Sequence, residues 1–217
     1  MLEIVPSLAS ANQSCLKDEI EKLGKDTVKE IHLDIEDGNF IPNITFGFKT
    51  VKDLRAVTEL PFSIHLMVNA PEKYLPKIRS FDVASVAVHL EACKYPKEII
   101  NLVKDLNMEI GMALNPKTPL DELEYILDDL DFILIMTAEP DCRGQEFILH
   151  TLKKVSELSL LKKGHQKIWV DGGINETHLY DIWKSGADKV VMGRAIFNAE
   201  NPKLKLEKLR DMIKNFK

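Results

Sequence analysis

Residues 31–38 read Ile-His-Leu-Asp-Ile-Glu-Asp-Gly, and this stretch decides how the rest of the chain is interpreted. Apolar residues alternate with polar ones, and the two-residue period of a strand puts His32 and Asp34 on the same side. The polar residues continue past the end of the apolar run. In (β/α)8 barrels, functional groups lie at the carboxyl ends of strands. The stretch therefore predicts a buried strand that leads into a functional site.

Seven further short apolar runs are spread along the chain, with amphipathic stretches between them. This alternation is the signature of βαβ units and a parallel sheet. The runs are rich in isoleucine, valine and leucine, as in strands buried on both faces. Eight strands, each followed by a helix, predict an α/β fold, a (β/α)8 TIM barrel that forms a single catalytic domain over residues 1–217. The predicted strands are residues 2–8, 30–35, 62–68, 83–89, 109–114, 132–136, 167–170 and 189–192.

The ends of several helices are also visible in the sequence. Gly24 is expected to stop the first helix. Thr118, placed before Pro119, predicts a capped helix start in which the hydroxyl accepts a hydrogen bond from an amide. Asn175 and Asn201 are expected to cap two later helices in the same way.

The composition is that of a soluble globular protein, with 45% hydrophobic and 29% charged residues. At 217 residues, one domain with one core is the default. The formal net charge of -5 argues against broad nucleic-acid binding, which needs a continuous patch of Lys and Arg. A local phosphate site remains compatible with this charge.

The cysteines and the apolar segments point to a reducing compartment. Cys15, Cys93 and Cys142 are odd in number and widely spaced, so we expect reduced thiols, not a disulfide framework or a thiolate zinc site. The first residues lack a basic region followed by an apolar stretch, and no later segment has the apolar length of a bilayer span. We therefore expect a cytoplasmic protein without membrane contact.

Polar residues at three predicted strand ends define a candidate metal site. His32 and Asp34 end the second strand, His65 the third and Asp171 the seventh. In a barrel, these two imidazoles and two carboxylates would converge. Such a set suits one divalent ion, Zn²⁺, Mn²⁺, Fe²⁺ or Co²⁺, without identifying which. Each residue alone could be satisfied by backbone hydrogen bonds, but the four together favour a metal site.

Glycines after the last two predicted strands indicate a phosphate site. Gly172 and Gly173 follow the seventh strand, and Gly193 and Arg194 follow the eighth. Barrels commonly hold phosphate there, on bare backbone amides and a helix N-terminus. A glycine pair alone is more often an ordinary turn, but this position favours phosphate. Arg194 could pair with the phosphate or face solvent.

An ordered set of short motifs closely resembles the ribulose-phosphate 3-epimerase family along nearly the full chain. Single motifs are weak signals, whereas the ordered set is strong. The motifs are PSL (6–8) with SA (10–11), HLD (32–34) with DG (37–38) and FIPN (40–43), HLM (65–67), VH (88–89) with Glu91, LNP (114–116) with TP (118–119), LIM (134–136), GQ (144–145) with Phe147, and VDGG (170–173).

The resemblance implies a metal-dependent 3-epimerase that acts on a ketose phosphate and forms a homo-oligomer. It also implies that His32, Asp34, His65 and Asp171 are the metal ligands, with Asp34 and Asp171 as the acid/base pair. Residues expected to bind the sugar phosphate, by the motifs or by the position of the glycines, are Ser7, His65, Met67, Met136, Gly144, Gly172, Gly173, Gly193 and Arg194.

The chemistry explains why such residue types are needed. A hydrogen beside a ketone is too weakly acidic for a carboxylate to remove unless the developing enediolate is stabilised. A metal ion supplies that stabilisation by polarising the carbonyl. Inversion at carbon 3 needs a proton removed from one face and another delivered to the opposite face. Asp34 and Asp171, from the second and seventh strands, can take these two positions, one ionised and the other protonated at the start.

Two departures from the family pattern lie near the substrate. The family usually carries a loop of the form NPGFGGQ after the sixth strand, whereas residues 139–145 read Glu-Pro-Asp-Cys-Arg-Gly-Gln. Glu139, Asp141, Cys142 and Arg143 could change the flexibility of this lid and its phosphate contacts. The family also tends to have Met at the position of Glu36, which could face the substrate or turn to solvent.

Several functions are compatible with this sequence. The leading hypothesis is conversion of D-ribulose 5-phosphate to D-xylulose 5-phosphate, and the nearest rival is the same reaction on allulose 6-phosphate or a tetrulose phosphate. A metal-independent decarboxylase or aldolase would need a Lys at a strand end, and none is well placed. A sugar-phosphate-binding protein without turnover would have little need for opposed acid and base. His89 and Glu91 could suggest a second metal site, but a structural role is expected.

Overall fold

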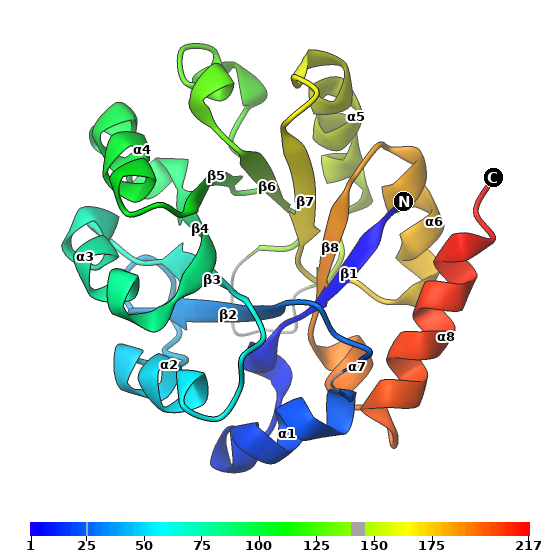
Figure 1. The fold of residues 1–217 in the computed structure, drawn as a ribbon. Coiled ribbons are helices and arrows are strands. Elements are labelled where there is room, and N and C mark those ends of the chain that lie inside the picture. The colour runs from blue at the N-terminus through cyan, green and yellow to red at the C-terminus, as the bar shows by residue number, and fades with distance from the viewer. Residues whose placement is uncertain (25, 140–145) are drawn as a thin grey trace.

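The predicted strands form one eight-stranded sheet at the centre of the molecule (Figure 1). The computed structural model describes residues 1–24, 26–139 and 146–217. Neighbouring strands follow the order β1-β8-β7-β6-β5-β4-β3-β2, and all these pairings are parallel. The strands are β1 (Glu3–Pro6), β2 (Ile31–Glu36), β3 (Phe62–Met67), β4 (Val83–His89), β5 (Glu109–Leu114), β6 (Phe132–Met136), β7 (Lys167–Asp171) and β8 (Lys189–Met192).

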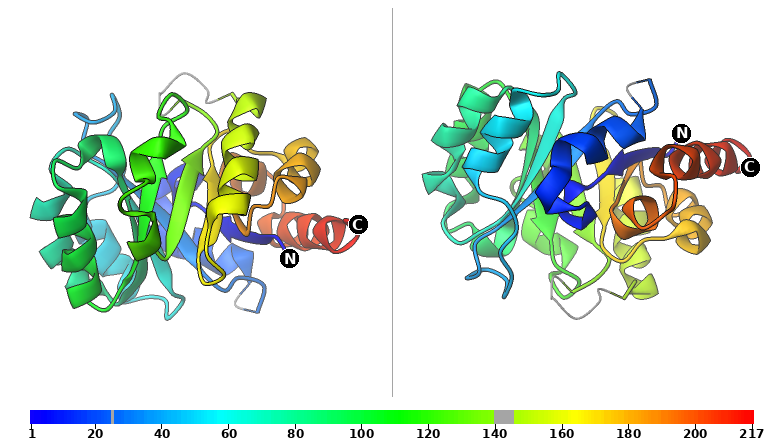
Figure 2. Two further views of the ribbon diagram at one scale, coloured as in Figure 1. Left: turned by 90° about the horizontal axis from the view of Figure 1, so that it is seen from above. Right: turned by 90° about the horizontal axis from the view of Figure 1, so that it is seen from below.

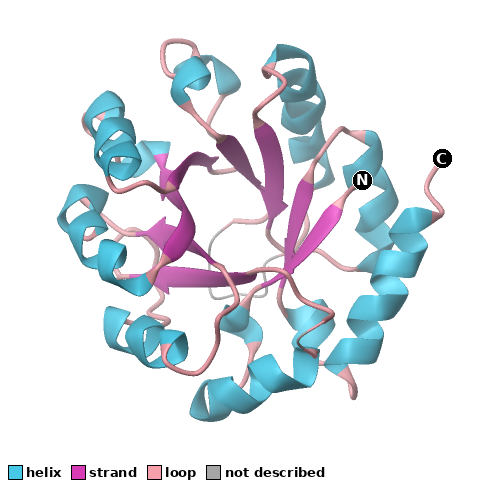
Figure 3. Ribbon diagram, viewed as in Figure 1, coloured by secondary structure: helices cyan, strands magenta, loops and turns pink. Residues whose placement is uncertain are grey.

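Helices form an outer layer around the sheet, as the secondary-structure colouring of Figure 3 makes plain. The two turned views in Figure 2 place both chain ends on the same side of the barrel, next to the last helix. The α-helices of the described residues are α1 (Leu16–Leu23), α2 (Phe48–Arg55), α3 (Leu75–Ile78), α4 (Pro96–Asp105), α5 (Leu152–Leu161), α6 (Leu179–Lys184), α7 (Arg194–Phe197) and α8 (Pro202–Lys214).

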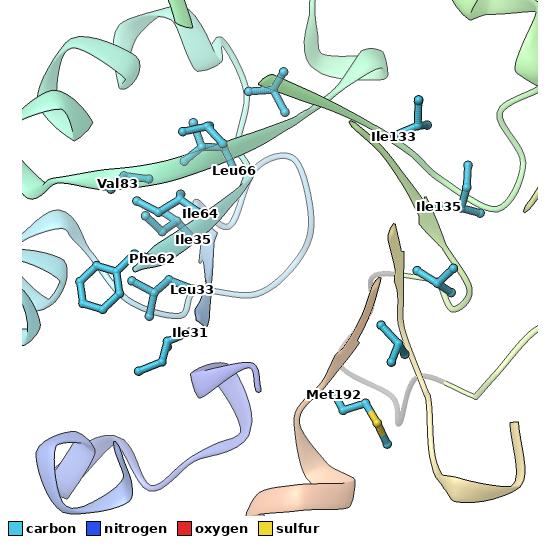
Figure 4. Packing of buried hydrophobic residues seen from close by; sticks show 14 of the residues in the cluster. Ile31, Leu33, Ile35, Phe62, Ile64, Leu66, Val83, Ile133, Ile135 and Met192 are labelled. Atoms are coloured by element: carbon cyan, nitrogen blue, oxygen red, sulfur yellow. The ribbon is translucent and has the colours of Figure 1, made fainter. Parts of the chain in front are cut away.

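Side chains point alternately outward and inward along each strand, and this creates two apolar layers. Ile31, Leu33 and Ile35 of β2 pack with Ile64 and Leu66 of β3 in the layer between barrel and helices (Figure 4). A second cluster fills the barrel interior with Ala87, Ala113, Phe132, Leu134, Met136, Trp169 and Val191. Because successive strand residues point to opposite faces, the polar residues between the β2 isoleucines and leucine face the interior.

The barrel closes between β1 and β2 at the site itself. Beyond the end of β1, Ser7 forms an isolated parallel bridge with His32. This bridge joins the two ends of the strand order, so the carboxyl ends of all eight strands meet around one opening. The prediction of a (β/α)8 barrel is confirmed.

The predicted strands agree with the observed ones within two residues at each end. The helix caps are also confirmed at Gly24, which has a positive φ of 79°, and at Asn175 and Asn201, whose side chains accept backbone N–H groups. The cap expected at Thr118 is wrong. Residues 115–131, all of them described, contain 3-10 turns but no α-helix, and the Thr118 hydroxyl donates to Glu91 instead.

None of the helices in the described part of the chain combines the length and the apolar character that a bilayer crossing requires.

Candidate active site

Four side chains converge at the carboxyl ends of β2, β3 and β7. His32 and Asp34 come from β2, His65 from β3 and Asp171 from β7, and one ligand atom of each lies within 4.8 Å of the others. The first three are buried, while the Asp171 side chain is 16% exposed. The structure thus brings together the four residues that the strand ends indicated.

His32 presents an unpaired nitrogen to this cluster. Its Nδ1 lies 3.0 Å from the hydroxyl of Ser63, and that hydroxyl donates to the carbonyl oxygen of Ile31 at 3.4 Å. In that arrangement the Ser63 hydroxyl accepts a hydrogen bond from Nδ1–H of His32, and the lone pair of the ring lies on Nε2. Within the described residues, this buried Nε2 has no hydrogen-bond partner, although it lies 3.3 Å from Asp34 Oδ1. A buried lone pair without a partner suits a metal ligand.

Asp34 uses its two oxygens for different partners. Oδ1 lies 3.2 Å from Nδ1 of His65, and Oδ2 accepts a hydrogen bond from the Ser7 hydroxyl at 2.5 Å. Burial alone would raise the pKa of Asp34, but the neighbouring His32 and His65 outweigh burial and lower it well below the usual range. Asp34 is therefore ionised at neutral pH.

His65 lies between the carboxylates and a second histidine. Its Nδ1 is 3.7 Å from Asp171 Oδ2, and its Nε2 is 2.9 Å from Nε2 of His89. Burial lowers the pKa of His65, but hydrogen bonds with Asp171 and Asp34 outweigh burial and raise the pKa to about 9. Two carboxylates beside Nδ1 thus favour a positive group at this position, either a protonated imidazole or a metal ion.

The donor set fits a divalent ion. Two ligands bound at about 2.1 Å with tetrahedral angles are roughly 3.4 Å apart. The imidazole nitrogens of His32 and His65 lie 3.2–3.9 Å from Asp34 Oδ1 and Asp171 Oδ2. These separations and the unpaired His32 nitrogen satisfy what a mixed imidazole and carboxylate site requires.

A cavity of about 390 Å³ lies above the four side chains. Asp34 and Asp171 reach its surface, while His32 and His65 are buried beneath it. Most residues expected to bind substrate line this cavity, namely Ser7, Met67, Met136, Gly172, Gly173, Gly193 and Arg194. Gly144 lies outside the described residues.

Two of these glycines are required by close packing. A Cβ on Gly172 would stand 2.7 Å from the backbone nitrogen of Ala138, and Gly172 has a φ of 114°, which side chains disfavour. A Cβ on Gly193 would stand 2.3 Å from the Ser10 hydroxyl. A side chain at either position would therefore collide with neighbouring residues, and both glycines line the cavity.

Known proteins match this chain over nearly its whole length. A profile of the ribulose-phosphate 3 epimerase family matches residues 3–197. The ribulose-phosphate 3-epimerase of Bacillus subtilis (strain 168) is 36% identical over 214 residues, which cover 97% of this chain and 99% of that protein. The enzyme of the same name from Methanocaldococcus jannaschii is 39% identical over 214 residues, covering 97% and 91%.

The chain belongs to the ribulose-phosphate 3-epimerase family. It is accordingly an enzyme of the isomerase class. A solved structure of the tryptophan synthase A-subunit from Pyrococcus furiosus superposes with a TM-score of 0.71 over 98% of this chain and 97% of that one, at 16% identity. That likeness extends to the barrel fold alone.

Glu36 gives this family member a carboxylate in the cavity wall. The residue is buried, lines the cavity and accepts a hydrogen bond from the Asn43 amide at 2.6 Å. Burial and the negative charge of Asp34 raise the pKa of Glu36 to about 7. Of the two orientations left open by the sequence, the structure has the one toward the cavity.

Two supporting residues of this epimerase were not identified from the sequence. Ser63 fixes His32, and Asn43 holds Glu36. His89, for which a structural role was expected, contacts His65. Ser63 lies two residues before His65 on β3, so it shares the inward face, and this period was the available signal. Asn43 is reached through the turn after β2, which no period predicts.

Proposed function

We propose that the chain catalyses the epimerisation of a ketose phosphate at carbon 3, with D-ribulose 5-phosphate and D-xylulose 5-phosphate as the interconverted pair. The observation that carries the proposal is the pair of carboxylates, Asp34 and Asp171, that reach one cavity beside two buried histidines. Membership of the epimerase family supports the reaction class.

His32, Asp34, His65 and Asp171 would hold one divalent ion, Zn²⁺, Mn²⁺, Fe²⁺ or Co²⁺. Such an ion, when bound, would polarise the substrate carbonyl and stabilise negative charge on its oxygen. The four side chains thereby also fix the end of the cavity at which carbons 2 and 3 bind.

Asp34 and Asp171 then transfer protons from and to carbon 3. One carboxylate takes the proton as the carbon–hydrogen bond breaks, and the electron pair moves into an enediolate. The other carboxylic acid delivers its proton to the opposite face of the same carbon, which inverts the configuration. Their strands suit this task, because β2 and β7 are separated by two strands on one side of the barrel and four on the other.

The phosphate of the substrate binds at the other end of the cavity. Gly172, Gly173 and Gly193 expose backbone there, and the Arg194 side chain lines the same wall. Backbone amides and a guanidinium are groups that bind phosphate. Holding the phosphate fixes the distance of carbon 3 from the two carboxylates.

A second candidate is the same reaction on another ketose phosphate, such as allulose 6-phosphate or a tetrulose phosphate. Glu36 is the observation that favours it, because a buried carboxylate lines the cavity beside Asp34. A carboxylate accepts hydrogen bonds from substrate hydroxyls, so it changes which sugar binds best.

The test is solvent-proton exchange. Metal-loaded protein in deuterated water is incubated with D-ribulose 5-phosphate and, separately, with allulose 6-phosphate, and NMR follows carbon 3. We expect deuterium at carbon 3 with formation of D-xylulose 5-phosphate. Exchange on allulose 6-phosphate alone would replace the first substrate by the second, and tight binding without exchange on any ketose phosphate would point to a binding protein.

Variants of the two carboxylates complete this test. Asp34→Asn and Asp171→Asn should each lower turnover by about 10³-fold or more while the fold is kept, because each removes one proton-transfer group. Asp131→Asn is the matched control. Its carboxylate accepts the backbone N–H of Ile110 at 2.8 Å, at the amino ends of the strands and away from the cavity. A homo-oligomeric assembly of the enzyme remains a prediction.

A further inference from the structure

A second histidine lies directly behind the site. His89, at the end of β4, is fully buried, as is His65. Their Nε2 atoms are 2.9 Å apart, the ring centroids are 4.9 Å apart and the ring planes differ by 22°. The two nitrogens thus meet edge to edge, as in a hydrogen bond. Only one of them can carry the proton in that contact, so the pair has a direction.

The direction is set by Glu91. Nδ1 of His89 lies 3.2 Å from Glu91 Oε2, while Glu91 Oε1 accepts hydrogen bonds from the Asn115 backbone N–H at 2.8 Å and from the Thr118 hydroxyl. Burial raises the pKa of Glu91, but the hydrogen bonds from His89, Thr118 and Asn115 outweigh burial and lower it to about 2. An ionised carboxylate can only accept, so Nδ1 of His89 must donate.

The donors that hold Glu91 are themselves fixed. Nζ of Lys154, on α5, donates to the carbonyl oxygens of Asn115, Pro116 and Thr118 at 3.0, 2.7 and 2.5 Å. This ammonium group ties the segment after β5 in the position from which it donates to Glu91. The segment therefore presents hydrogen-bond donors, and no acceptor, to Oε1.

We propose that Glu91 and His89 form a relay of hydrogen bonds that holds His65 in the tautomer whose Nδ1 lone pair faces the metal site. Because His89 donates from Nδ1, its Nε2 is an acceptor, and His65 must donate from Nε2. In the neutral ring that His65 must have as a metal ligand, the lone pair then lies on Nδ1, the atom 3.2 Å from Asp34 Oδ1 and 3.7 Å from Asp171 Oδ2. Glu91 and His89 are positioning residues that act through His65.

The proposal rests on the metal-dependent function proposed above. Under it, each of the two histidine ligands donates a hydrogen bond from the ring nitrogen that does not face the metal. Ser63 accepts a hydrogen bond from Nδ1–H of His32, which leaves the Nε2 lone pair for a metal ion. His89 accepts a hydrogen bond from Nε2–H of His65, which leaves the Nδ1 lone pair. Groups that orient metal ligands in this way commonly change metal affinity by about 10–100-fold when they are substituted.

The variant that tests the relay is Glu91→Gln. The substitution nearly keeps the shape of the side chain at residue 91, and it reverses the direction of the hydrogen bonds through His89 to His65. The new amide keeps its oxygen on the Asn115 and Thr118 donors, so its NH2 group faces His89. His89 would then accept at Nδ1 and donate from Nε2, which pushes the proton of His65 onto Nδ1. We expect the dissociation constant for Zn²⁺, measured by competition with a chelating dye, to rise about 10–100-fold.

The matched control is again Asp131→Asn, which makes the same carboxylate-to-amide change outside the site and should leave Zn²⁺ affinity unchanged. Circular dichroism and the melting temperature of the metal-free proteins check that both variants fold. Zn²⁺ affinity of the folded Glu91→Gln protein equal to that of the unmodified protein would overturn the relay. Unmodified protein that binds no divalent ion would overturn the metal-dependent function itself.

A measurement on the unmodified protein keeps the proposal testable if the variant does not fold. In the Zn²⁺-loaded protein with ¹⁵N-labelled histidines, long-range ¹H–¹⁵N correlation spectra distinguish the two tautomers. We expect a proton on Nε2 of His65 and on Nδ1 of His89. A proton on Nε2 of His89 would overturn the relay even if the metal binds.

Discussion

The hydroxyl of Ser7 donates a 2.5 Å hydrogen bond to Oδ2 of Asp34, across the point at which the barrel closes. Asp34 directs its other oxygen toward His65. The two oxygens thus have different partners, since Oδ1 faces His32 and His65 of the candidate metal site and Oδ2 is held by Ser7 at the surface of the cavity. Ser7, expected from the resemblance to contact substrate, thus also positions the carboxylate that we propose as an acid/base group.

Ser7→Ala should therefore lower kcat more than it raises KM. The hydrogen bond to a charged group is worth about 1.5–3 kcal/mol, so we expect a loss of roughly 10–100-fold in kcat. Steady-state kinetics with D-ribulose 5-phosphate measures the loss, and Ser80→Ala, at an exposed position outside the cavity, is the control. An unchanged kcat would show that Asp34 needs no support from Ser7.

Metal affinity should increase with pH. The pKa of His65 is raised to about 9 in the metal-free protein, so at neutral pH its Nδ1 carries a proton that a metal ion must displace. Each bound ion then releases one proton, and the apparent affinity should rise about tenfold per pH unit up to about pH 9, where the slope levels off. Calorimetry in buffers of different ionisation enthalpy counts the protons. No release at pH 7 would contradict a protonated His65.

The sequence predicted most of the fold, because the strand period and the strand ends are local features. The isoleucines and leucine of β2 identify the outward face, and that alone places His32 and Asp34 inside the barrel. The closure of the barrel between β1 and β2, in contrast, is not a local feature of the sequence. It depends on a single bridge between Ser7 and His32, residues 25 positions apart along the chain, and no local period specifies it.

The candidate site was predicted in part for the same reason. Its four central residues end strands, whereas the partners that orient them depend on the register between strands. Ser63 reaches His32 because β2 and β3 pair these two residues directly. Thr118 was misinterpreted as a helix cap because the sequence does not reveal that the partly buried carboxylate of Glu91 accepts a hydrogen bond from its hydroxyl.

Gly193→Ala should weaken substrate binding. An added Cβ would stand 2.3 Å from the Ser10 hydroxyl and 2.9 Å from Ser10 Cβ, so the cavity wall at the proposed phosphate end must shift. Because the phosphate takes no part in proton transfer, we expect KM to rise about tenfold with a smaller change in kcat. Gly164→Ala, where a Cβ meets nothing within 4 Å, is the control. A variant with unchanged KM would move the phosphate site away from this wall.

Substitutions of Glu36 should identify the sugar that the cavity fits. Glu36→Gln keeps an acceptor for the Asn43 amide but removes the charge, and Glu36→Met removes the polar group. For a substrate whose hydroxyl donates to this carboxylate, the loss of a charged acceptor should lower kcat/KM by about tenfold or more, and the Met variant should lose most. For a substrate without that contact, both variants should stay within about twofold of the unmodified enzyme, since no hydrogen bond is lost. The measurement compares kcat/KM for D-ribulose 5-phosphate, allulose 6-phosphate and a tetrulose phosphate. A decrease confined to one sugar assigns Glu36 to its recognition, whereas equal decreases for all three would mean that Glu36 supports the metal site and does not select the substrate.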